Sequence, residues 1–586
     1  MIMLICHRLL THRKLVLLPM LVVTMAAPSR AAMDIGAAYA ANSSVVSAES
    51  ALQRGDCGAA STLYAQATKK LAQSELAARA TSVALACGQY STARATAERW
   101  VQLVPGDPTA LLALTEAQLR GDQTDAARKS FQRWLAGSGG NADAKGTEPK
   151  ATLKVPEVIA ALAQTVGAES TLAMLRDIKD PRLRGAPVQL ALSALALDSW
   201  DAAEARRYAH SAQVAGAKPS RVAVIESRAM AILGDSKGAL AAARSAASDK
   251  SGRLSLAETQ LLLGLEPEAQ AELLRLRSDP EVGSAAARLL AQTALETADY
   301  AIAEQRCKAL LQDPSSAALG VYYLGVIAER RGDDASAERN YALLAGTPFE
   351  SQGRQRAAMI LYKQGERDAA VRVLSGERDA QPEERIRGEI AAAQLLADAG
   401  AHDESVSRIE GALRRAPGHP ELAYQRAVLL DRGGRIDAAI ATLEGLHRER
   451  PHDAGITNAL GFTLADHKRD LPRAEQLIRA ALATQPDNPA LLDSLGWVLY
   501  RRGQNAAALP ALARAFRLLH DGDVGAHWGE VLWVTGQKSA AQAAWKRALA
   551  ADPENKLLAA TVHRYTPTLS APKPPPALEP APRTSI

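Results

Sequence analysis

The chain has 586 residues, more than a single hydrophobic core usually supports, so several domains or an extended repeat architecture are expected. Apolar residues make up 47% of it but aromatic residues only 4%, a mixture typical of closely packed helices rich in alanine and leucine. The 69 basic residues nearly balance the 64 acidic ones, and no basic block is present to follow a phosphate backbone, which argues against nucleic acid as a partner.

Residues 1–31 have the features of a targeting segment. Arg13 and Lys14 precede an apolar run over residues 15–25, and small residues follow at the expected cleavage site. This pattern is typical of a secretory signal peptide that is removed. The alternative is a retained anchor, although the apolar run is shorter than the roughly 20 residues that span a bilayer. No later stretch is apolar enough to span, and no cysteine near the cleavage site offers a lipid attachment point, so we expect a periplasmic protein.

Three cysteines remain once Cys6 leaves with the signal peptide. Cys57 and Cys87 fall in neighbouring repeat units, one just after a helix–helix turn and the other just before the next. They form a candidate disulfide, which an oxidising compartment would allow; the alternative is two separate buried thiols. Cys307 falls at a core position of a helix and is expected to be buried.

A glycine followed five residues later by an alanine recurs along the chain, and many successive glycines lie 33 residues apart. A glycine can end a helix in a left-handed conformation, and an alanine lets the next helix approach closely. The pattern therefore predicts repeated helix–turn–helix units. The pairs are Gly55/Ala60, Gly88/Ala93, Gly121/Ala126, Gly234/Ala239, Gly264/Ala269, Gly332/Ala337, Gly365/Ala370, Gly434/Ala439, Gly503/Ala508 and Gly536/Ala541.

The pattern is most complete near the C-terminus. There Gly496 opens one unit, Gly503 turns the chain and Ala508 marks the inner face of the second helix; Gly529 and Ala541 repeat the arrangement. These residues resemble the tetratricopeptide repeat, a helix–turn–helix unit of about 34 residues with small residues at its eighth, twentieth and twenty-seventh positions. The resemblance implies an all-α fold, a tetratricopeptide-repeat solenoid in which antiparallel helix pairs form a right-handed superhelix.

Breaks in the repeat pattern indicate how the chain is organised. Residues 45–137 are predicted to form an N-terminal repeat array, and residues 138–150, rich in glycine and small polar residues, a flexible linker. Degenerate helical repeats follow over 151–220, and the main superhelix over 221–562. The proline-rich residues 566–586 cannot continue a helix and are interpreted as a disordered spacer, with recognition by a partner as the alternative.

Signatures of enzymes are missing from the sequence. It contains no HExxH motif, no glycine-rich phosphate loop after a strand and no Gly-x-Ser-x-Gly elbow. His447, His452 and His467 lie near helix ends without metal-ligand spacing. We therefore expect no catalytic residue, no metal and no cofactor; an enzyme hidden in the degenerate repeats remains the alternative.

Stacked helix pairs leave a long concave surface that suits a peptide or a partner domain. In tetratricopeptide repeats this groove is lined by the second, fifth, ninth, twelfth and thirteenth positions of each first helix, so the resemblance assigns residues when the count starts from Gly461, Gly496 and Gly529. Aromatic residues beside charges would anchor a partner; the alternative is that the tryptophans only pack between helices. The assigned residues are Asn458, Phe462, Asp493, Trp497, Tyr500, Arg501, Glu530 and Trp533.

The C-terminal block is more particular than the generic repeat. Residues 457–462, 492–500 and 527–532 are similar to proteobacterial cell-envelope repeat lipoproteins that act as adaptor of the periplasmic carboxyl-terminal processing protease. The resemblance implies a scaffold that binds other proteins or peptides, holds such a protease and presents substrates such as cell-wall hydrolases to it. An assembly or secretion factor for envelope polysaccharide or outer-membrane components would use the same architecture and stays open.

Overall fold

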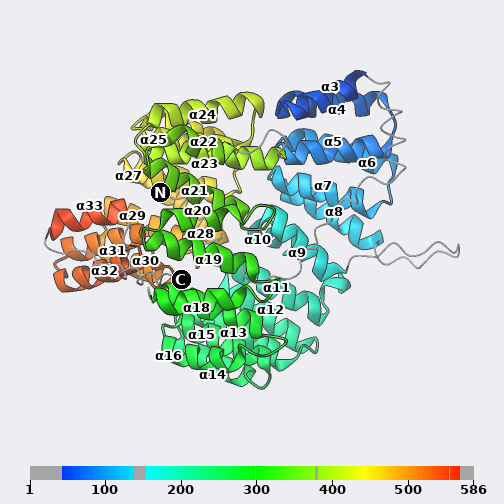
Figure 1. The fold of residues 1–586 in the computed structure, drawn as a ribbon. Coiled ribbons are helices and arrows are strands. Elements are labelled where there is room, and N and C mark those ends of the chain that lie inside the picture. Colours follow the sequence, from blue (N-terminus) through cyan, green and yellow to red (C-terminus); the bar gives the residue numbers. More distant parts are fainter. Residues whose placement is uncertain (1–42, 138–153, 297–298, 376–380, 553–554, 568–586) are drawn as a thin grey trace, which may run out of the picture. The chain divides into compact units, whose positions relative to one another are not determined.

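The computed structural model describes residues 43–137, 154–296, 299–375, 381–552 and 555–567. Within these ranges the chain is helical and contains no strand, and consecutive helices pack as antiparallel pairs (Figure 1). The predicted all-α fold of repeated helix pairs is confirmed. The predicted signal peptide, the predicted linker and nearly all of the proline-rich tail lie outside the described residues.

The chain forms two compact units, each built from two separate stretches of sequence. The larger unit takes its described residues from 43–248 and 371–488, and the smaller unit from 249–370 and 489–567. Helix α22 (Arg367–Ser375) lies at the boundary between two of these stretches. We describe the two units separately.

The larger unit contains helices of the predicted N-terminal array, of the predicted degenerate repeats and of part of the predicted main superhelix. They are α3 (Ser43–Gln53), α4 (Cys57–Lys70), α5 (Ser74–Ala86), α6 (Tyr90–Leu103), α7 (Pro108–Arg120), α8 (Thr124–Gly137), α9 (Val155–Val166), α10 (Ala168–Leu175), the short 3-10 helix η1 (Pro181–Leu183), α11 (Ala186–Asp198), α12 (Ala202–Val214), α13 (Pro219–Leu233), α14 (Ser236–Ala246), α23 (Pro382–Asp398), α24 (His402–Arg415), α25 (Pro420–Arg432), α26 (Ile436–Glu449), α27 (Ala454–Asp466) and α28 (Leu471–Thr484).

The smaller unit contains the C-terminal helix pairs and a stretch from the middle of the chain. Its helices are α15 (Lys250–Leu262), α16 (Glu266–Leu276), α17 (Gly283–Glu296), α18 (Tyr300–Leu310), α19 (Ala317–Arg330), α20 (Asp334–Ala342), α21 (Glu350–Lys363), α29 (Pro489–Arg501), α30 (Asn505–Leu518), α31 (Gly522–Val534), α32 (Lys538–Ala551) and α33 (Lys556–Tyr565).

The turns inside the pairs depend on a left-handed residue. Gly503, between α29 and α30, has φ +76°, and the other predicted turn glycines also have positive φ, with one exception. The prediction for Gly121 is wrong, because its φ is −87° and the next residue, Asp122, takes φ +59° instead. Aspartate tolerates this conformation better than most side chains do. In the degenerate repeats Trp200 occupies the corresponding place with φ +56°, which is why the glycine signal is lost there.

Close approach of the two helices in a pair explains the small residues at the eighth position. A Cβ added at Gly461 would lie 2.7 Å from Cγ1 of Ile478, and one at Gly529 would overlap the indole ring of Trp545. Glycine is therefore required at this position, because the second helix of the same pair leaves no room for a side chain. The turn between α27 and α28 is one residue longer than the turn between α29 and α30, and it contains positive φ at both Lys468 and Asp470.

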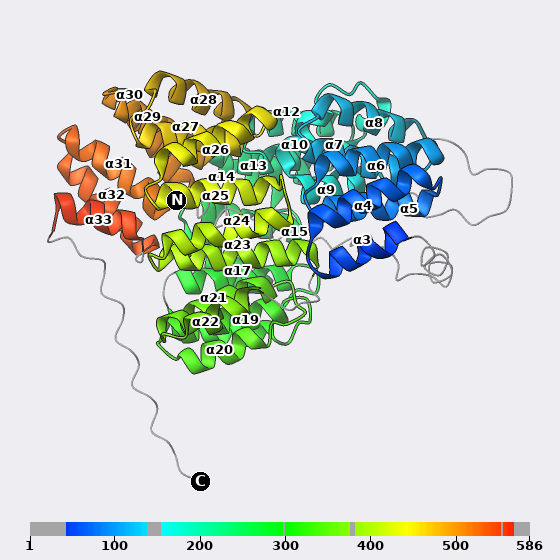
Figure 2. The same cartoon turned by 90° about the horizontal axis from the view of Figure 1, so that it is seen from above.

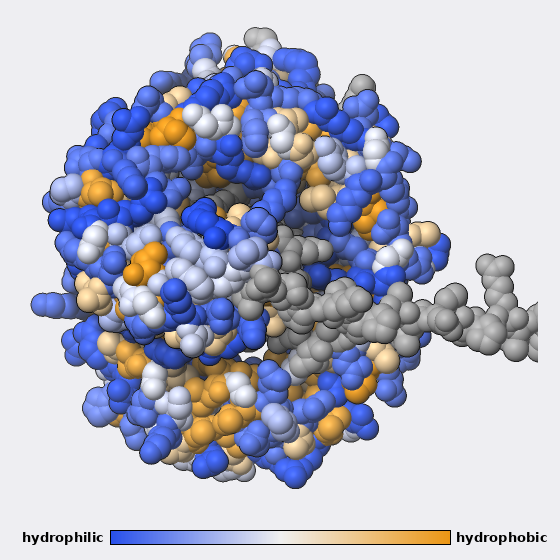
Figure 3. Space-filling view, turned by 90° about the vertical axis from the view of Figure 1, so that its left-hand side faces the viewer, coloured by the Kyte–Doolittle hydropathy of each residue, from blue (hydrophilic) through white to orange (hydrophobic). Residues whose placement is uncertain are grey.

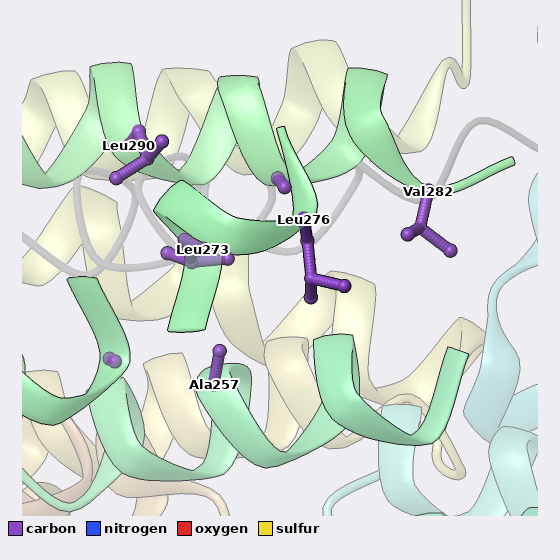
Figure 4. Packing of buried hydrophobic residues seen from close by; sticks show 7 residues of the cluster. Ala257, Leu273, Leu276, Val282 and Leu290 are labelled. Carbon is purple, nitrogen blue, oxygen red and sulfur yellow. The ribbon is translucent and has the colours of Figure 1, made fainter. Parts of the chain in front are cut away.

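The interior is built from leucine and alanine, as the composition indicates. In the smaller unit, Ala257 of α15 faces Leu273 and Leu276 of α16 (Figure 4). The same cluster also contains Ala269, Val282, Ala286 and Leu290. Burying each large aliphatic side chain contributes about 1.5–3 kcal/mol. On the face shown in Figure 3, hydrophilic residues predominate and hydrophobic residues form smaller patches among them.

Candidate partner-binding groove

Six of the residues assigned to the groove lie on the first helices of the last two repeat pairs in the smaller unit. Asp493, Trp497, Tyr500 and Arg501 belong to α29, and Glu530 and Trp533 belong to α31. Intervals of three and four residues place side chains on the same face of a helix. Contacts between α29 and α31 bring these side chains together.

Trp497 lies at the centre of this group. Its ring stacks on the imidazole of His527, with ring centroids 4.1 Å apart, and lies 5.3 Å from the ring of Tyr500. The guanidinium of Arg501 sits 5.3 Å from the Trp497 ring centroid, a favourable cation–π position. Only 6% of Trp497 is exposed, whereas Tyr500 and Arg501 are half-buried. The Trp497 ring therefore packs between neighbouring first helices, and the more exposed Tyr500 and Arg501 extend the group.

Carboxylates accompany these rings. Nδ1 of His527 lies 2.9 Å from Oδ2 of Asp493, and both side chains are almost completely buried. The Tyr500 hydroxyl donates a hydrogen bond to Oε1 of Glu530 at 3.0 Å. Burial, followed by the nearby Glu530 carboxylate, raises the pKa of Tyr500, so its hydroxyl remains a neutral donor. Two carboxylates are thus held in fixed positions beside aromatic surface.

A second aromatic group surrounds Trp533. Its ring lies 5.7 Å from the ring of Trp545 on α32 and 5.9 Å from the ring of Tyr565 on α33. The Lys538 ammonium is 5.2 Å from the Trp533 ring centroid. Trp533 is only half-buried, so part of its indole stays available for contact.

Four further residues join this face. Asp523 is 5% exposed, its Oδ1 accepts a hydrogen bond from the Asn555 amide at 3.0 Å, and burial raises its pKa. Asp523 is the second position in the count from Gly529, so the repeat scheme could have found it. His527 falls at a position that the scheme does not use. Arg564 and Tyr565 lie on α33, beyond the last Gly/Ala pair, and have no repeat signal at all.

The remaining two assigned residues, Asn458 and Phe462, lie on α27 of the larger unit. Both are buried, at 2% and 6% exposure. Within the described chain, Oδ1 of Asn458 has no hydrogen-bond partner. Neighbouring Thr457 pairs its hydroxyl with Nδ1 of His447 at 3.1 Å, so this histidine has a structural partner.

The structure joins Cys57 and Cys87 in a disulfide, with their Cα atoms 5.3 Å apart. Cys307 is buried as a free thiol, and burial raises its pKa to about 12, so it stays protonated. Among the described residues no group of three or more His, Cys, Asp or Glu side chains is arranged to hold a metal ion. In the same part of the chain no helix combines the length and apolarity needed to cross a bilayer.

Comparison with known proteins identifies the repeats. Family models described as tetratricopeptide repeat match residues 82–142, 396–460 and 462–519. These segments are tetratricopeptide repeats. The matched segments lie in both compact units and include α29, which carries much of the candidate groove. Tetratricopeptide repeats generally serve as non-catalytic scaffolds that bind other proteins.

One curated relative is a tetratricopeptide repeat-containing protein of Pseudomonas aeruginosa. It is 32% identical over 209 residues, a match that covers 36% of this chain and 35% of the relative. This chain thus spans about a third of the relative that it matches.

Solved structures with repeats of this kind are more distant. A tetratricopeptide repeat protein from Parabacteroides merdae is 15% identical and covers 42% of this chain and 97% of its own, with a TM-score of 0.32. A chain from the structure of the APC/C hetero-tetramer Cut9–Hcn1 is 14% identical, and the match covers 90% of this chain and 98% of that one, with a TM-score of 0.30. Superpositions this loose carry no information about partners.

Proposed function

We propose that the protein is an exported, non-catalytic scaffold whose groove on α29, α31 and α33 binds a segment of another protein. The observation that carries this proposal is the row of aromatic rings and carboxylates on neighbouring first helices, with Trp497, Tyr500 and Glu530 in mutual contact or linked by a hydrogen bond. Aromatic residues beside fixed charges are the usual anchors of protein interfaces.

The half-buried rings of Tyr500 and Trp533 favour a partner segment with apolar side chains, because the carboxylates of the groove are buried and already paired. Asp523 is paired in the described chain with the neutral amide of Asn555, and Asp493 with a histidine that carries charge only when protonated. Arg564, 3.6 Å from Glu530, partly neutralises the far end of the groove.

The finer role that we propose is that of a periplasmic adaptor, which presents protein substrates such as cell-wall hydrolases to a carboxyl-terminal processing protease. The likeness of residues 457–462, 492–500 and 527–532 to such adaptors supports it. A disulfide between Cys57 and Cys87 is compatible with an oxidising compartment. The predicted signal peptide supports export.

Crosslinking followed by co-purification from the periplasm tests both levels of this proposal. We expect a processing protease and its substrates to be recovered with the wild-type chain. Less of each should be recovered with Tyr500→Phe, which removes the hydrogen bond to Glu530, or with Glu530→Gln, which keeps an acceptor oxygen but removes the carboxylate charge. Tyr362→Phe provides the matched control, because Tyr362 is also a half-buried tyrosine of the smaller unit but lies on α21, which carries no groove residue. Circular dichroism checks that every variant stays helical.

The possible outcomes of this experiment distinguish the general scaffold proposal from the adaptor proposal. Recovery of polysaccharide-export or outer-membrane assembly machinery instead of a protease would refute the adaptor role and leave the scaffold. Full recovery of every partner with both groove variants would show that this groove is not the binding surface.

A further inference from the structure

In the larger unit, successive turns of the first stretch meet successive turns of the second stretch. The paired residues lie about ten repeats apart in sequence: 333 residues separate Leu52 from Arg385, and 330 separate Asp122 from His452. Figure 2 shows α3 and α4 beside α23 and α24, and the hydrogen bonds place the same elements in contact. The contact thus follows the repeat period from one pair to the next.

The first contact caps a helix. The Arg385 guanidinium, at the start of α23, donates hydrogen bonds to the carbonyl oxygens of Leu52 at 2.8 Å and Gln53 at 3.3 Å, at the end of α3. The last carbonyls of a helix have no partner within it, and a cation there also compensates the helix dipole.

The second contact is the tightest. The turn between α24 and α25 inserts Pro417 and His419 against α4 and the turn between α5 and α6. A Cβ on Gly58 would lie 2.7 Å from Cδ of Pro417, and one on Gly88 would overlap the His419 ring. The Gln89 amide donates to the carbonyl oxygen of Pro417 at 2.7 Å. Side chains larger than hydrogen at these two glycines would push the turn away.

The third contact follows one repeat later. The backbone N–H of His452 donates to Oδ2 of Asp122 at 3.0 Å, and the Arg450 guanidinium donates to the carbonyl oxygen of Arg120. Here the left-handed Asp122, the residue that departs from the glycine pattern, supplies the acceptor.

The disulfide lies at the second contact. Cys57 directly precedes Gly58, and Cys87 directly precedes Gly88, so the bond joins the two surfaces that receive Pro417 and His419. Both cysteines are buried, at 3% and 0% exposure. The disulfide therefore fixes the spacing between the two glycines, and the turn seated on them lies beside the sulfurs.

We propose that the Cys57–Cys87 disulfide is a redox-sensitive clasp that keeps the N-terminal repeats docked on the turn between α24 and α25. A dithiol reductant opens it: one thiolate attacks a cysteine sulfur to form a mixed disulfide, and the second thiolate resolves it. Two protein thiols and an oxidised dithiol result. The docked α24–α25 turn shields the two sulfurs from reductant. The disulfide in turn holds in place the surface around Gly58 and Gly88 on which that turn docks.

Hydrogen–deuterium exchange of the full chain, before and after reduction with dithiothreitol, tests the proposal. We expect backbone amides of residues 416–423 to exchange about tenfold faster after reduction, while α7 and α8 keep their protection, because the array stays folded but undocks. Cys57→Ser with Cys87→Ser should give the same pattern without reductant. Unchanged exchange over 416–423 would overturn the proposal, and so would unfolding of α4 and α5 themselves, since the bond would then only staple that pair.

Gly58→Ala tests whether docking protects the disulfide, because it disturbs the docked turn while the disulfide is intact. Its Cβ should displace Pro417, speed exchange over residues 416–423, and make reduction by dithiothreitol about tenfold faster. Gly445→Ala is the matched control, because Gly445 is also helical and a Cβ there meets nothing within 4 Å. Equal reduction rates for Gly58→Ala, Gly445→Ala and the wild-type chain would show that docking does not shield the bond.

Discussion

Gly529→Ala tests whether the small residue at the eighth position is set by helix packing. An added Cβ would overlap three atoms of the Trp545 indole, a ring that is completely buried and cannot move aside. Overpacking costs about 1–3 kcal/mol, and a rigid ring places this site at the upper end. Part of this loss is offset, because alanine stabilises a helix by up to about 1 kcal/mol relative to glycine. We expect a net loss of about 2 kcal/mol in the free energy of unfolding.

Urea unfolding followed by intrinsic fluorescence measures this loss where it occurs. Of the 7 tryptophans in the chain, Trp497, Trp528, Trp533 and Trp545 lie in the last repeat pairs, so the signal reports mainly on them. Gly445→Ala serves as control and should gain about 0.5–1 kcal/mol, because its Cβ has open space. If Gly529→Ala is stabilised as much as the control, the two helices do not approach as described and the repeat register is wrong.

Three other outcomes are expected. Ala508→Leu, at a position with 0% exposure, should overpack α29 against α30 and cost about 1–3 kcal/mol, and an unchanged melting temperature would contradict this. Tyr500→Ala should weaken capture of the native partner by about 1–3 kcal/mol, measured by titration with a folding check; full binding by this variant would contradict it. Burial and then Arg120 lower the pKa of His419 to about 4, below its unfolded value, so stability is complete above pH 6.5 and falls as pH drops toward 4. Urea unfolding near pH 7.5 and about pH 5 should show this fall in the wild-type chain and less of it in His419→Asn, which retains a capping acceptor.

The repeated helix pairs could be predicted from sequence because each depends on local rules. The turn at Gly503 needs a positive φ, and the close approach at Gly529 needs a missing side chain, and both leave a visible residue in the sequence. Where another residue takes over the role, as Trp200 and Asp122 do, the same reasoning loses the turn or misplaces it by one residue.

The side chains on the groove could be predicted only in part. Counting positions placed Trp497, Tyr500 and Glu530 on facing helices, because one repeat is one structural period. It did not show that the Trp497 ring would be stacked on His527 and buried, since that depends on the angle between neighbouring helices. Docking between residues more than 300 apart has no local signal at all.

Asp122 and its contact with His452 restrict how this sequence can change in length. Because the two docked stretches are joined by contacts spaced one repeat apart, both must contain the same number of repeats between matching turns. Deleting a single repeat from one stretch would leave the remaining pairs able to fold, yet every turn beyond the deletion would meet the wrong counterpart. We therefore expect the loss of a complete repeat from either docked stretch to disrupt docking more than a single-residue insertion in a turn that makes no docking contact.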